Sequence, residues 1–260
     1  FTKGDNAMDK VVFITGGSTG IGNACVHKFH NEGYKVAFMD INQEEGQKIA
    51  NNLKDVLFIA GDTKNKEDIK NAVARAVEKF GNFDVISLNA GIHRCNTILD
   101  ISDEELDLII QTNIYGYVNT MRIAIPHMKK EGGSIVINAS DQCFVGKPNS
   151  FAYGLTKGAL GQITKSLSLD LAPKIRVNAV CAGTIKTPMA ERLFQDFANI
   201  THGGNTDFYW QNEAEKYPLK KVGQANEVAE LIYFLASPKA SFITGGLYLI
   251  DGGLTAGIPH

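Results

Sequence analysis

Short apolar runs alternate with amphipathic segments along almost the whole chain, and this alternation limits the possible folds more than any other feature. Strands are predicted at 10–15, 34–40, 56–60, 83–88, 134–139, 175–180 and 247–250. Besides a helix directly after the first strand, helices are predicted at 43–53, 66–80, 103–130, 150–171 and 226–236. Strands that are apolar throughout are typical of parallel sheets covered on both faces. We therefore predict a single-domain α/β fold of the Rossmann type, a doubly wound parallel sheet of about seven strands with helices on both faces.

Composition excludes several classes of protein. The 260 residues carry a net charge of -2 without a long basic run, so binding to nucleic acid or to an anionic membrane is not expected. The apolar runs fall short of 18 residues, so no membrane span is predicted. Four widely spaced cysteines favour reduced thiols and a cytoplasmic location. Two histidines on one helix face, His27 and His30, lack an indicated third ligand, so no metal site is predicted.

A glycine-rich turn follows the first strand. It reads Gly16-Gly17-Ser18-Thr19-Gly20-Ile21-Gly22 and leads into a helical pattern. Glycines permit a tight turn and a close approach of the backbone, and a helix N-terminus offers unpaired N–H groups to an anion. The spacing is GxxxGxG instead of the commoner GxGxxG, and such turns also occur as plain connections. We predict that this turn holds the phosphates of a dinucleotide through Gly16, Ser18, Thr19, Gly20 and Ile21.

The second strand ends in Asp40, 18 positions after Gly22. A carboxylate at this place is expected to accept a hydrogen bond from the adenosine ribose 2′-hydroxyl of NAD. A 2′-phosphate would need a nearby cation, but Thr19 and Ile41 occupy the positions where one would be expected. NAD is therefore predicted, and NADP is disfavoured. The alternative role for Asp40 is to cap the following helix.

Two further loops at predicted strand ends are assigned to the cofactor. Asp62, which Thr63 follows, lies just beyond the third strand, where its carboxylate could bond the adenine amino group. The alternative is that Asp62 only forms a turn. The fourth strand runs into Asn89-Ala90-Gly91, where small residues would let the backbone lie against the cofactor.

Tyr153 and Lys157 are four residues apart in a predicted helix, so the phenol and the ammonium share one face. An ammonium lowers the pKa of a neighbouring phenol, and a shift from about 10 to about 7 requires roughly 4 kcal/mol. Ser140 follows the fifth strand and is expected at the carboxyl end of the sheet, where ligands bind. Tyr and Lys at this spacing are also common without any catalytic role. The nucleotide signals at the other strand ends make this stretch a predicted active site.

In the order and placement of these motifs, the chain resembles the short-chain dehydrogenase/reductase family from Lys10 to Gly253. The resemblance rests on the turn at 15–22, Asn89-Ala90-Gly91, Asn113, Ser140, Tyr153-x-x-x-Lys157 and the turn at 183–188. It implies NAD(P)-dependent interconversion of a secondary alcohol and a ketone by hydride transfer. We accordingly interpret 8–260 as one NAD-binding catalytic domain. Residues 1–7, which precede Met8, are interpreted as an expression remnant.

The resemblance also implies individual roles. Tyr153 is expected to be the general acid/base, and Ser140 to hold the reacting oxygen. Lys157 is expected to bond the nicotinamide ribose and to lower the pKa of Tyr153. Asn113 is expected to keep a water in a proton relay.

The turn after the sixth strand completes the expected cofactor contacts through Gly183, Ile185 and Thr187, with Thr187 on the nicotinamide carboxamide. Many family members have Pro-Gly where this chain has Ala182-Gly183. The family usually forms tetramers or dimers, so a homotetramer or homodimer is expected. A catalytically silent dinucleotide-binding redox sensor or scaffold is the alternative function, and the presence of both Tyr153 and Lys157 argues against it.

Substrate contacts are expected near the same strand ends. The candidates for binding a small-molecule alcohol or ketone are His93, Gln142, Tyr153 and Met189, with Asp141 and Phe144 as further possibilities. The loop candidates could instead be solvated surface residues. The pattern loosens at 189–218, which we interpret as an insertion over the substrate. Within it, Phe208-Tyr209-Trp210 could close over the substrate or pack against the body or a neighbouring subunit.

Overall fold

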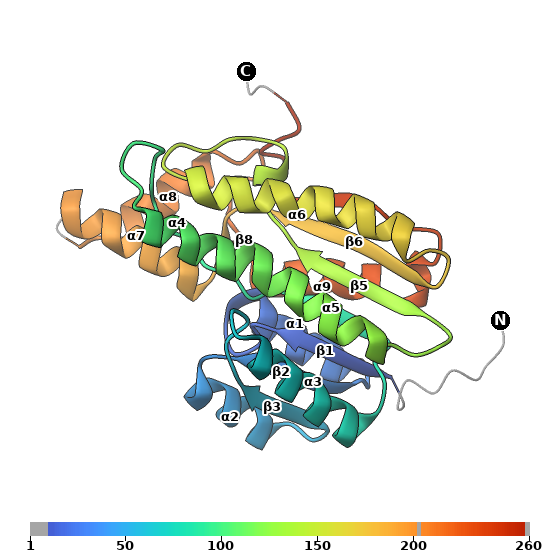
Figure 1. Ribbon diagram of the computed structural model, residues 1–260. Helices are drawn as coiled ribbons and strands as arrows, with labels where there is room; N and C mark the ends of the chain where they lie inside the picture. Colours follow the sequence, from blue (N-terminus) through green and yellow to red (C-terminus); the bar gives the residue numbers. More distant parts are fainter. Residues whose placement is uncertain (1–9, 202–203, 258–260) are drawn as a thin grey trace.

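The computed structural model describes residues 10–201 and 204–257, and its centre is a parallel seven-stranded sheet (Figure 1). The strand order is β3-β2-β1-β4-β5-β6-β9. The strands are β1 (Val11–Thr15), β2 (Lys35–Asp40), β3 (Val56–Ala60), β4 (Val85–Leu88), β5 (Gly133–Asn138), β6 (Ile175–Ala182) and β9 (Leu247–Ile250). The predicted doubly wound sheet is confirmed. Residues 1–7, interpreted above as an expression remnant, lie outside the described residues.

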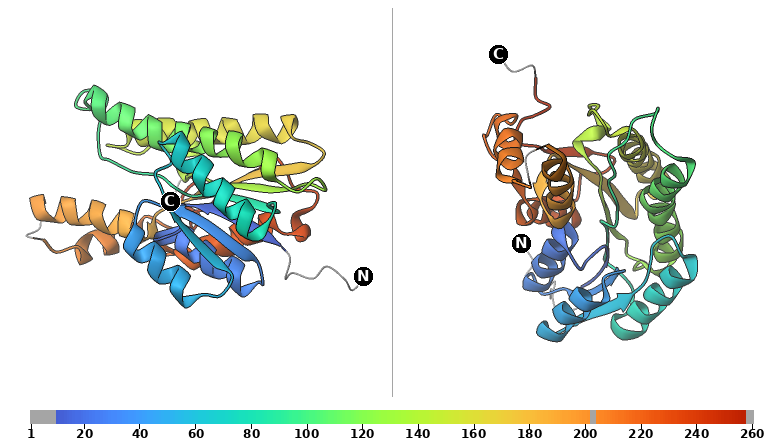
Figure 2. Two further views of the ribbon diagram at one scale, coloured as in Figure 1. Left: turned by 60° about the horizontal axis from the view of Figure 1, so that its bottom comes forward. Right: turned by 90° about the vertical axis from the view of Figure 1, so that its left-hand side faces the viewer.

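Helices cover both faces of the sheet (Figure 2). One face is covered by α1 (Gly20–Asn31), α2 (Gln43–Asn52) and α9 (Ala225–Ala236). The other face is covered by α3 (Lys66–Phe80), α5 (Gly116–Ala124) and α6 (Phe151–Asp170). The strands are buried by both layers because each carries apolar side chains toward both faces, as the uninterrupted apolar runs predicted.

The prediction of one continuous helix at 103–130 is wrong, because the helix is interrupted and ends earlier than predicted. The chain forms α4 (Asp103–Ile110), a π-helical turn (Gln111–Tyr115), α5 and a 3₁₀ turn (Ile125–His127). The π turn contains Asn113, whose side chain is bonded to a loop from another part of the chain. Single π turns inside helices often occur at functional sites. After His127 the chain is extended, and Met128 forms a bridge with Phe83.

The stretch at 189–218, which showed no clean periodicity, contains two helices in the structure. They are α7 (Pro188–Thr201) and α8 (Asp207–Glu215), and they extend past the end of the sheet at the left of Figure 1. A separate two-stranded ladder of β7 (Ile185–Lys186) and β8 (Gly223–Gln224) joins the two ends of this excursion. The excursion therefore leaves and re-enters the body at one place.

Two further findings concern only the residues that the structure describes. Among them, no helix is long and apolar enough to cross a membrane. In the same residues, no group of three or more His, Cys, Asp or Glu side chains is placed to hold a metal ion. The four cysteines, all of which lie in the described residues, form no disulfide.

Candidate active site

The predicted cofactor loops meet at the carboxyl ends of the strands, where the strand order reverses between β1 and β4. In doubly wound sheets, ligands bind in the crevice at this point. The glycine-rich turn follows β1, Asn89-Ala90-Gly91 follows β4 and Ser140 follows β5. The topology thus brings together segments that are far apart in the sequence.

The glycine-rich turn is shaped to accept an anion. Gly16 has φ +69°, and a Cβ at this position would lie 2.8 Å from the Cα of Ala90, so the two loops touch through backbone. Thr19 precedes the first turn of α1 but makes no side-chain capping hydrogen bond. The first N–H groups of α1 therefore remain available to a ligand. This arrangement fits the predicted phosphate cradle.

The turn at 183–188 lies directly against this cradle. A Cβ at Gly20 would lie 3.2 Å from Thr187 Cγ2. Thr187 Oγ1 donates to the backbone oxygen of Ile185 at 3.2 Å, and Ile185 is buried. The structure thus brings the predicted nicotinamide residues next to the predicted phosphate residues.

Asp40 connects the end of β2 to the glycine-rich turn. Its Oδ2 accepts from Ser18 N and its Oδ1 accepts from Asn42 N, both at 2.9 Å. The N-cap of α2 is Asn42, which accepts from Glu45 N, so the alternative of Asp40 as the helix cap is wrong. A carboxylate held by two backbone N–H groups has a fixed orientation at the edge of the crevice. The sequence did not indicate its bond to Ser18.

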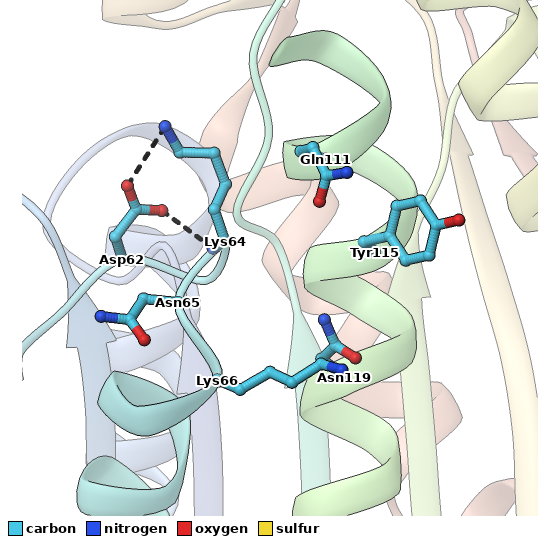
Figure 3. A pocket seen from close by; sticks show the side chains of 7 residues that line it. All are labelled: Asp62, Lys64, Asn65, Lys66, Gln111, Tyr115 and Asn119. Carbon is cyan, nitrogen blue, oxygen red and sulfur yellow. Dashed lines mark hydrogen bonds and ion pairs between the residues drawn. The ribbon is translucent and has the colours of Figure 1, made fainter. Parts of the chain in front are cut away.

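Asp62 forms a turn. Its Oδ1 accepts from Lys64 N at 2.9 Å, and its Oδ2 lies 3.4 Å from Lys64 Nζ. Figure 3 shows Asp62 and Lys64 on one wall of a surface pocket of about 670 Å³, opposite Gln111 and Asn119. Thr63 is buried against Gly116 at the start of α5. The turn alternative is therefore present in the structure, and adenine binding by Asp62 and Thr63 stays a prediction.

The Asn89-Ala90-Gly91 segment supplies one open hydrogen-bonding atom. Asn89 N and Ala90 N both approach Thr15 Oγ1, at 3.2 and 3.4 Å. The amide nitrogen of Asn89 donates to Ser87, whereas its Oδ1 is buried without a hydrogen-bond partner. Buried polar atoms are normally paired. An acceptor left open beside the phosphate cradle fits a ligand donor such as a ribose hydroxyl, so the residues present fit a dinucleotide.

Asn113 ties the π turn to the loop after β4. Its Oδ1 accepts from Ile92 N at 2.8 Å, and its Nδ2 donates to Ile92 O at 2.9 Å and to Thr156 Oγ1 at 3.2 Å. All three partners lie outside its own helix, which is π-helical at this position. Through Thr156, which also donates to Tyr153 O at 2.8 Å, Asn113 supports the helix that carries the phenol.

Lys157 is buried beneath the predicted catalytic Tyr153. Its Nζ donates to Asn138 O at 2.8 Å and lies 5.4 Å from the centre of the Tyr153 ring. Tyr117 OH donates to the same Asn138 oxygen at 3.2 Å. Burial lowers the pKa of Lys157 to about 8. The helical spacing does place ammonium and phenol on one face, as predicted.

The pKa of Tyr153 is shifted in the direction opposite to the one expected from the sequence. Part of the side chain is exposed, but the phenol group is enclosed, and burial raises its pKa above the usual value. The negative charge of Asp141 raises the pKa further, while a hydrogen bond with Ser140 lowers it. Desolvation and a buried carboxylate thus outweigh the hydrogen bond with Ser140.

Ser140 is not free at the strand end, which the sequence did not show. Its Oγ donates to Asp141 Oδ1 at 2.9 Å and accepts from Gln142 N at 3.2 Å. Asp141 is fully buried, and its Oδ2 lies 2.7 Å from Lys147 Nζ. Asp141 therefore faces Ser140 and Lys147 and does not line the surface of a pocket. The only signal in the sequence was an acidic residue directly after Ser140.

The predicted substrate residues are partly brought together. The His93 ring centre lies 4.4 Å from that of Tyr153, and His93 Nε2 lies 3.1 Å from Ser150 Oγ. Burial lowers the pKa of His93 to about 4. Gln142 Oε1 is buried without a hydrogen-bond partner and lies close to Gly154. Met189, at the start of α7, and Phe144 are exposed.

Two residues near the end of the excursion support the 183–188 turn, and the sequence reasoning missed both. Tyr217 OH accepts from Thr184 N at 2.7 Å, and Thr184 Oγ1 donates to Glu213 Oε1 at 2.6 Å. Tyr217 is buried. No pattern in the sequence connects positions about 30 residues apart in this way.

The aromatic run in α8 packs on α7. The Phe194 ring lies 4.5 Å from Trp210 in an edge-on arrangement and 6.1 Å from Tyr209 in a stacked one, between ring centres. Phe208 is 48% exposed. Tyr209 and Trp210 thus pack within the excursion itself. This arrangement differs from both predicted alternatives, closure over the substrate and packing against the body or a neighbouring subunit.

A doubly wound sheet with a glycine-rich turn at its switch point, and a tyrosine and a lysine on one helix beside it, is the arrangement expected of a dinucleotide-dependent oxidoreductase. A family profile described as enoyl-(acyl carrier protein) reductase matches residues 16–255. A short-chain dehydrogenase family protein from Francisella tularensis is 41% identical, with a TM-score of 0.87 and coverage of 95% of this chain and 99% of that one.

Two further solved structures agree in fold. The aldohexose dehydrogenase of Thermoplasma acidophilum is 34% identical, with a TM-score of 0.90 and coverage of 98% and 97% of the two chains. The L-sorbose reductase of Gluconobacter frateurii, complexed with NADPH and L-sorbose, is 29% identical, with a TM-score of 0.90 and coverage of 96% and 97%. The present chain belongs to the short-chain dehydrogenase/reductase family, whose members are NAD(P)-binding oxidoreductases.

Proposed function

We propose that this protein is an NAD-dependent oxidoreductase that interconverts a secondary alcohol and a ketone. The proposal depends mainly on one observation, the enclosed Tyr153 phenol bonded to Ser140 above a buried Lys157, at the carboxyl end of the sheet. A bound nicotinamide supplies the hydride chemistry. The chain supplies the positions of the reactants and the path of the proton.

Tyr153 acts as the general acid/base. In carbonyl reduction it donates its proton to the carbonyl oxygen, and in alcohol oxidation the phenolate accepts the hydroxyl proton. Ser140 positions the reacting oxygen beside the phenol. Lys157 and Asn113 hold the surrounding groups, Lys157 through Asn138 O and Asn113 through Ile92 and Thr156.

The remaining predicted residues bind the cofactor. Gly16, Ser18, Thr19, Gly20 and Ile21 hold the phosphates, and Asn89, Ala90 and Gly91 lie against the ribose. Gly183, Ile185 and Thr187 contact the nicotinamide, while Asp62 and Thr63 contact the adenine. Asp40 supports NAD over NADP because its carboxylate repels a 2′-phosphate, and neither Thr19 nor Ile41 offers a cation to one.

The substrate is a small polar molecule held by His93, Gln142, Tyr153 and Met189 below the insertion at 189–218. The buried Gln142 Oε1 has no hydrogen-bond partner. An amide oxygen can only accept a hydrogen bond, so this atom supports a substrate that carries a hydroxyl donor. The sugars named for the aldohexose and L-sorbose relatives make polyols and sugars the first candidates. Nothing observed supports the alternative of a silent sensor or scaffold.

The function is tested with a panel of sugars, polyols, steroid alcohols and acyl thioesters, each with NAD and with NADP. Turnover is followed by the absorbance of the reduced nicotinamide. Tyr153→Phe should abolish turnover and leave NADH binding nearly intact. Tyr233→Phe is the matched control, because Tyr233 packs on Phe29 and Tyr34 at the end of α1 that is remote from the glycine-rich turn. Full activity of Tyr153→Phe would contradict the assignment.

We further propose a cytoplasmic homotetramer or homodimer. Exposed apolar side chains support an assembly, among them Leu169 at 80% exposure on α6 and Leu249 on β9. The lack of disulfides among the four cysteines, all in the described residues, supports the location. Light scattering of the purified protein measures the oligomeric state, and a monomer at all concentrations would contradict the assembly.

A further inference from the structure

A surface pocket beside the predicted adenine contact has no part in the mechanism above. It has a volume of about 670 Å³ and lies between the segment 62–66 and the stretch formed by the π turn and α5 (Figure 3). A pocket of this size can hold a small organic molecule. Its lining side chains are all polar or charged, and among them only Asp62 is assigned to the cofactor. They belong to Asp62, Lys64, Asn65, Lys66, Gln111, Tyr115 and Asn119.

Asn119 is the strongest indication of a ligand in this pocket. It lies on α5, is only 6% exposed and lines the pocket with its side chain. Within the described part of the chain, no group forms a hydrogen bond with its side-chain amide. Buried polar groups are normally paired, and an unpaired one costs stability. A ligand in the pocket would supply the missing partner.

The positive charge of the pocket comes from Lys66, the first residue of α3. Its side chain is exposed and points toward Asn119 in Figure 3. The described residues include no acidic partner of Lys66 in an ion pair. Lys64, in contrast, lies 3.4 Å from Asp62, so these two charges largely cancel. The partial positive charge at the N-terminus of α3 adds to that of Lys66.

The acidic residues in the first turn of α3 are already bound to other groups. Glu67 forms an ion pair with Lys70 at 2.7 Å. Asp68 accepts from Asn65 Nδ2 at 3.0 Å with one oxygen and from a backbone N–H at 2.9 Å with the other. Neither carboxylate is therefore left to neutralise Lys66, and the pocket attracts an anion.

Gln111 and Tyr115 add hydrogen-bond donors from the π turn. Both side chains are exposed and line the pocket on the side of α5. Ammonium, amide and phenol groups all donate hydrogen bonds, and bonds to an ionised acceptor are stronger than bonds between neutral groups. An oxyanion in the pocket thus has donors on both sides. A partner subunit is a poorer match for these walls, because lysine is depleted in subunit interfaces.

We propose that this pocket is a second ligand site, which binds a small molecule through a carboxylate or phosphate group. Lys66 supplies the charge, and the amides of Asn119 and Gln111 supply hydrogen bonds. The site adjoins the predicted adenine contact but contains none of the proposed catalytic residues. The inference therefore goes beyond the proposed reaction and holds whichever alcohol or ketone is the substrate.

The test is the thermal unfolding midpoint, Tm, of the whole chain saturated with NADH, so that the glycine-rich turn is already occupied. Inorganic phosphate and citrate are titrated separately, while sodium chloride keeps the ionic strength constant. A ligand that binds the folded state raises the Tm in a saturable way. We expect saturation with at least one of the two probes. Saturation with citrate alone indicates a carboxylate ligand, and saturation with phosphate alone indicates a phosphate ester.

Two variants examine the pocket itself. Lys66→Gln removes the charge and should weaken binding of the probe by about tenfold, the effect of losing one hydrogen bond to a charged group. Asn119→Leu removes the amide at similar size. It should weaken binding too, yet be no less stable than the wild type without the probe, because it removes an unpaired polar group. Lys79→Gln is the matched control, because it makes the same change of charge at the exposed last turn of α3.

A saturable rise in Tm that weakens in both pocket variants and persists in Lys79→Gln supports the inference. The lack of a saturable rise with either probe would overturn it, and so would equal binding by the wild type and Lys66→Gln. An equal loss in Lys79→Gln would overturn it as well, since net charge alone would then explain the effect. If Asn119→Leu does not fold, its amide has a structural role, and this too counts against the inference. The proposed function is tested separately, by the activity of Tyr153→Phe.

Discussion

Replacing Asn113 by Ala tests how firmly the π turn holds the loop that carries His93. Asn113 is fully buried, and its amide makes three hydrogen bonds, two with the backbone of Ile92 and one with Thr156. A hydrogen bond contributes about 1 kcal/mol net. Truncation removes all three and leaves the Ile92 N–H and C=O without this partner. We expect the free energy of unfolding to fall by about 3 kcal/mol.

The assay is urea denaturation followed by circular dichroism at one fixed protein concentration, because an oligomer unfolds in a concentration-dependent way. Asn51→Ala is the matched control. Asn51 is exposed on α2, and its side chain accepts one hydrogen bond, from Gln47. It should change the stability by no more than about 0.5 kcal/mol. A loss below about 1 kcal/mol for Asn113→Ala would refute the reasoning, since a single lost hydrogen bond would then account for the whole change in stability.

Asn113→Asp should make the loss of stability depend on pH. One carboxylate oxygen still accepts from Ile92 N, but the other faces the Ile92 carbonyl oxygen, to which the amide donated. Only the protonated carboxyl can donate there, so its pKa is raised in the folded state above its unfolded value of about 4. The destabilisation therefore appears as the pH rises above that value. The stability deficit relative to the wild type should be smaller at about pH 5 than at about pH 8.

Two further predictions concern charges at the site. Asp40→Asn should raise the affinity for NADPH relative to NADH by about tenfold or more, because it removes the repulsion of a 2′-phosphate. Fluorescence titration with both cofactors measures the ratio of the affinities. Equal changes for both cofactors would contradict the predicted contact of Asp40 with the ribose. Lys157 has a folded pKa of about 8 against a usual 10.5, so the unfolded state binds more protons between these values. The stability of the wild type relative to Lys157→Met should then rise with pH across this window, and parallel stability curves would show that the lysine is not shifted.

The sheet could be predicted because its signals are local. Each strand is a short apolar run, and the glycine-rich turn and Asp40 mark consecutive strand ends. The helical spacing of Tyr153 and Lys157 likewise places both on one face, whatever surrounds them. Patterns of this kind depend on neighbours along the chain, which a single sequence displays.

The differences arise where distant residues decide the structure. The π turn contains Asn113, which contacts Ile92, 21 residues earlier, and the helical pattern at 103–130 does not indicate this contact. The pKa of Tyr153 is raised by burial of the phenol and then by a buried Asp141, although a charged residue in a loop is ordinarily expected in water. The two helices of the excursion are held by Phe194 against Trp210, a packing that periodicity in either segment alone does not show.

The hydrogen bonds from Thr184 to Glu213 and Tyr217 connect the excursion to the turn that we assign to the nicotinamide. Thr184 belongs to the turn assigned to the nicotinamide, while Glu213 lies in α8 and Tyr217 just after it. A displacement of α8 that moves these two side chains must break both bonds or move the turn. A ligand that orders the excursion therefore favours the ordered turn, and a ligand that orders the turn favours the ordered excursion by the same coupling free energy. A substrate bound under α7 and α8 would raise the affinity for the cofactor, and the cofactor would raise the affinity for the substrate by the same factor.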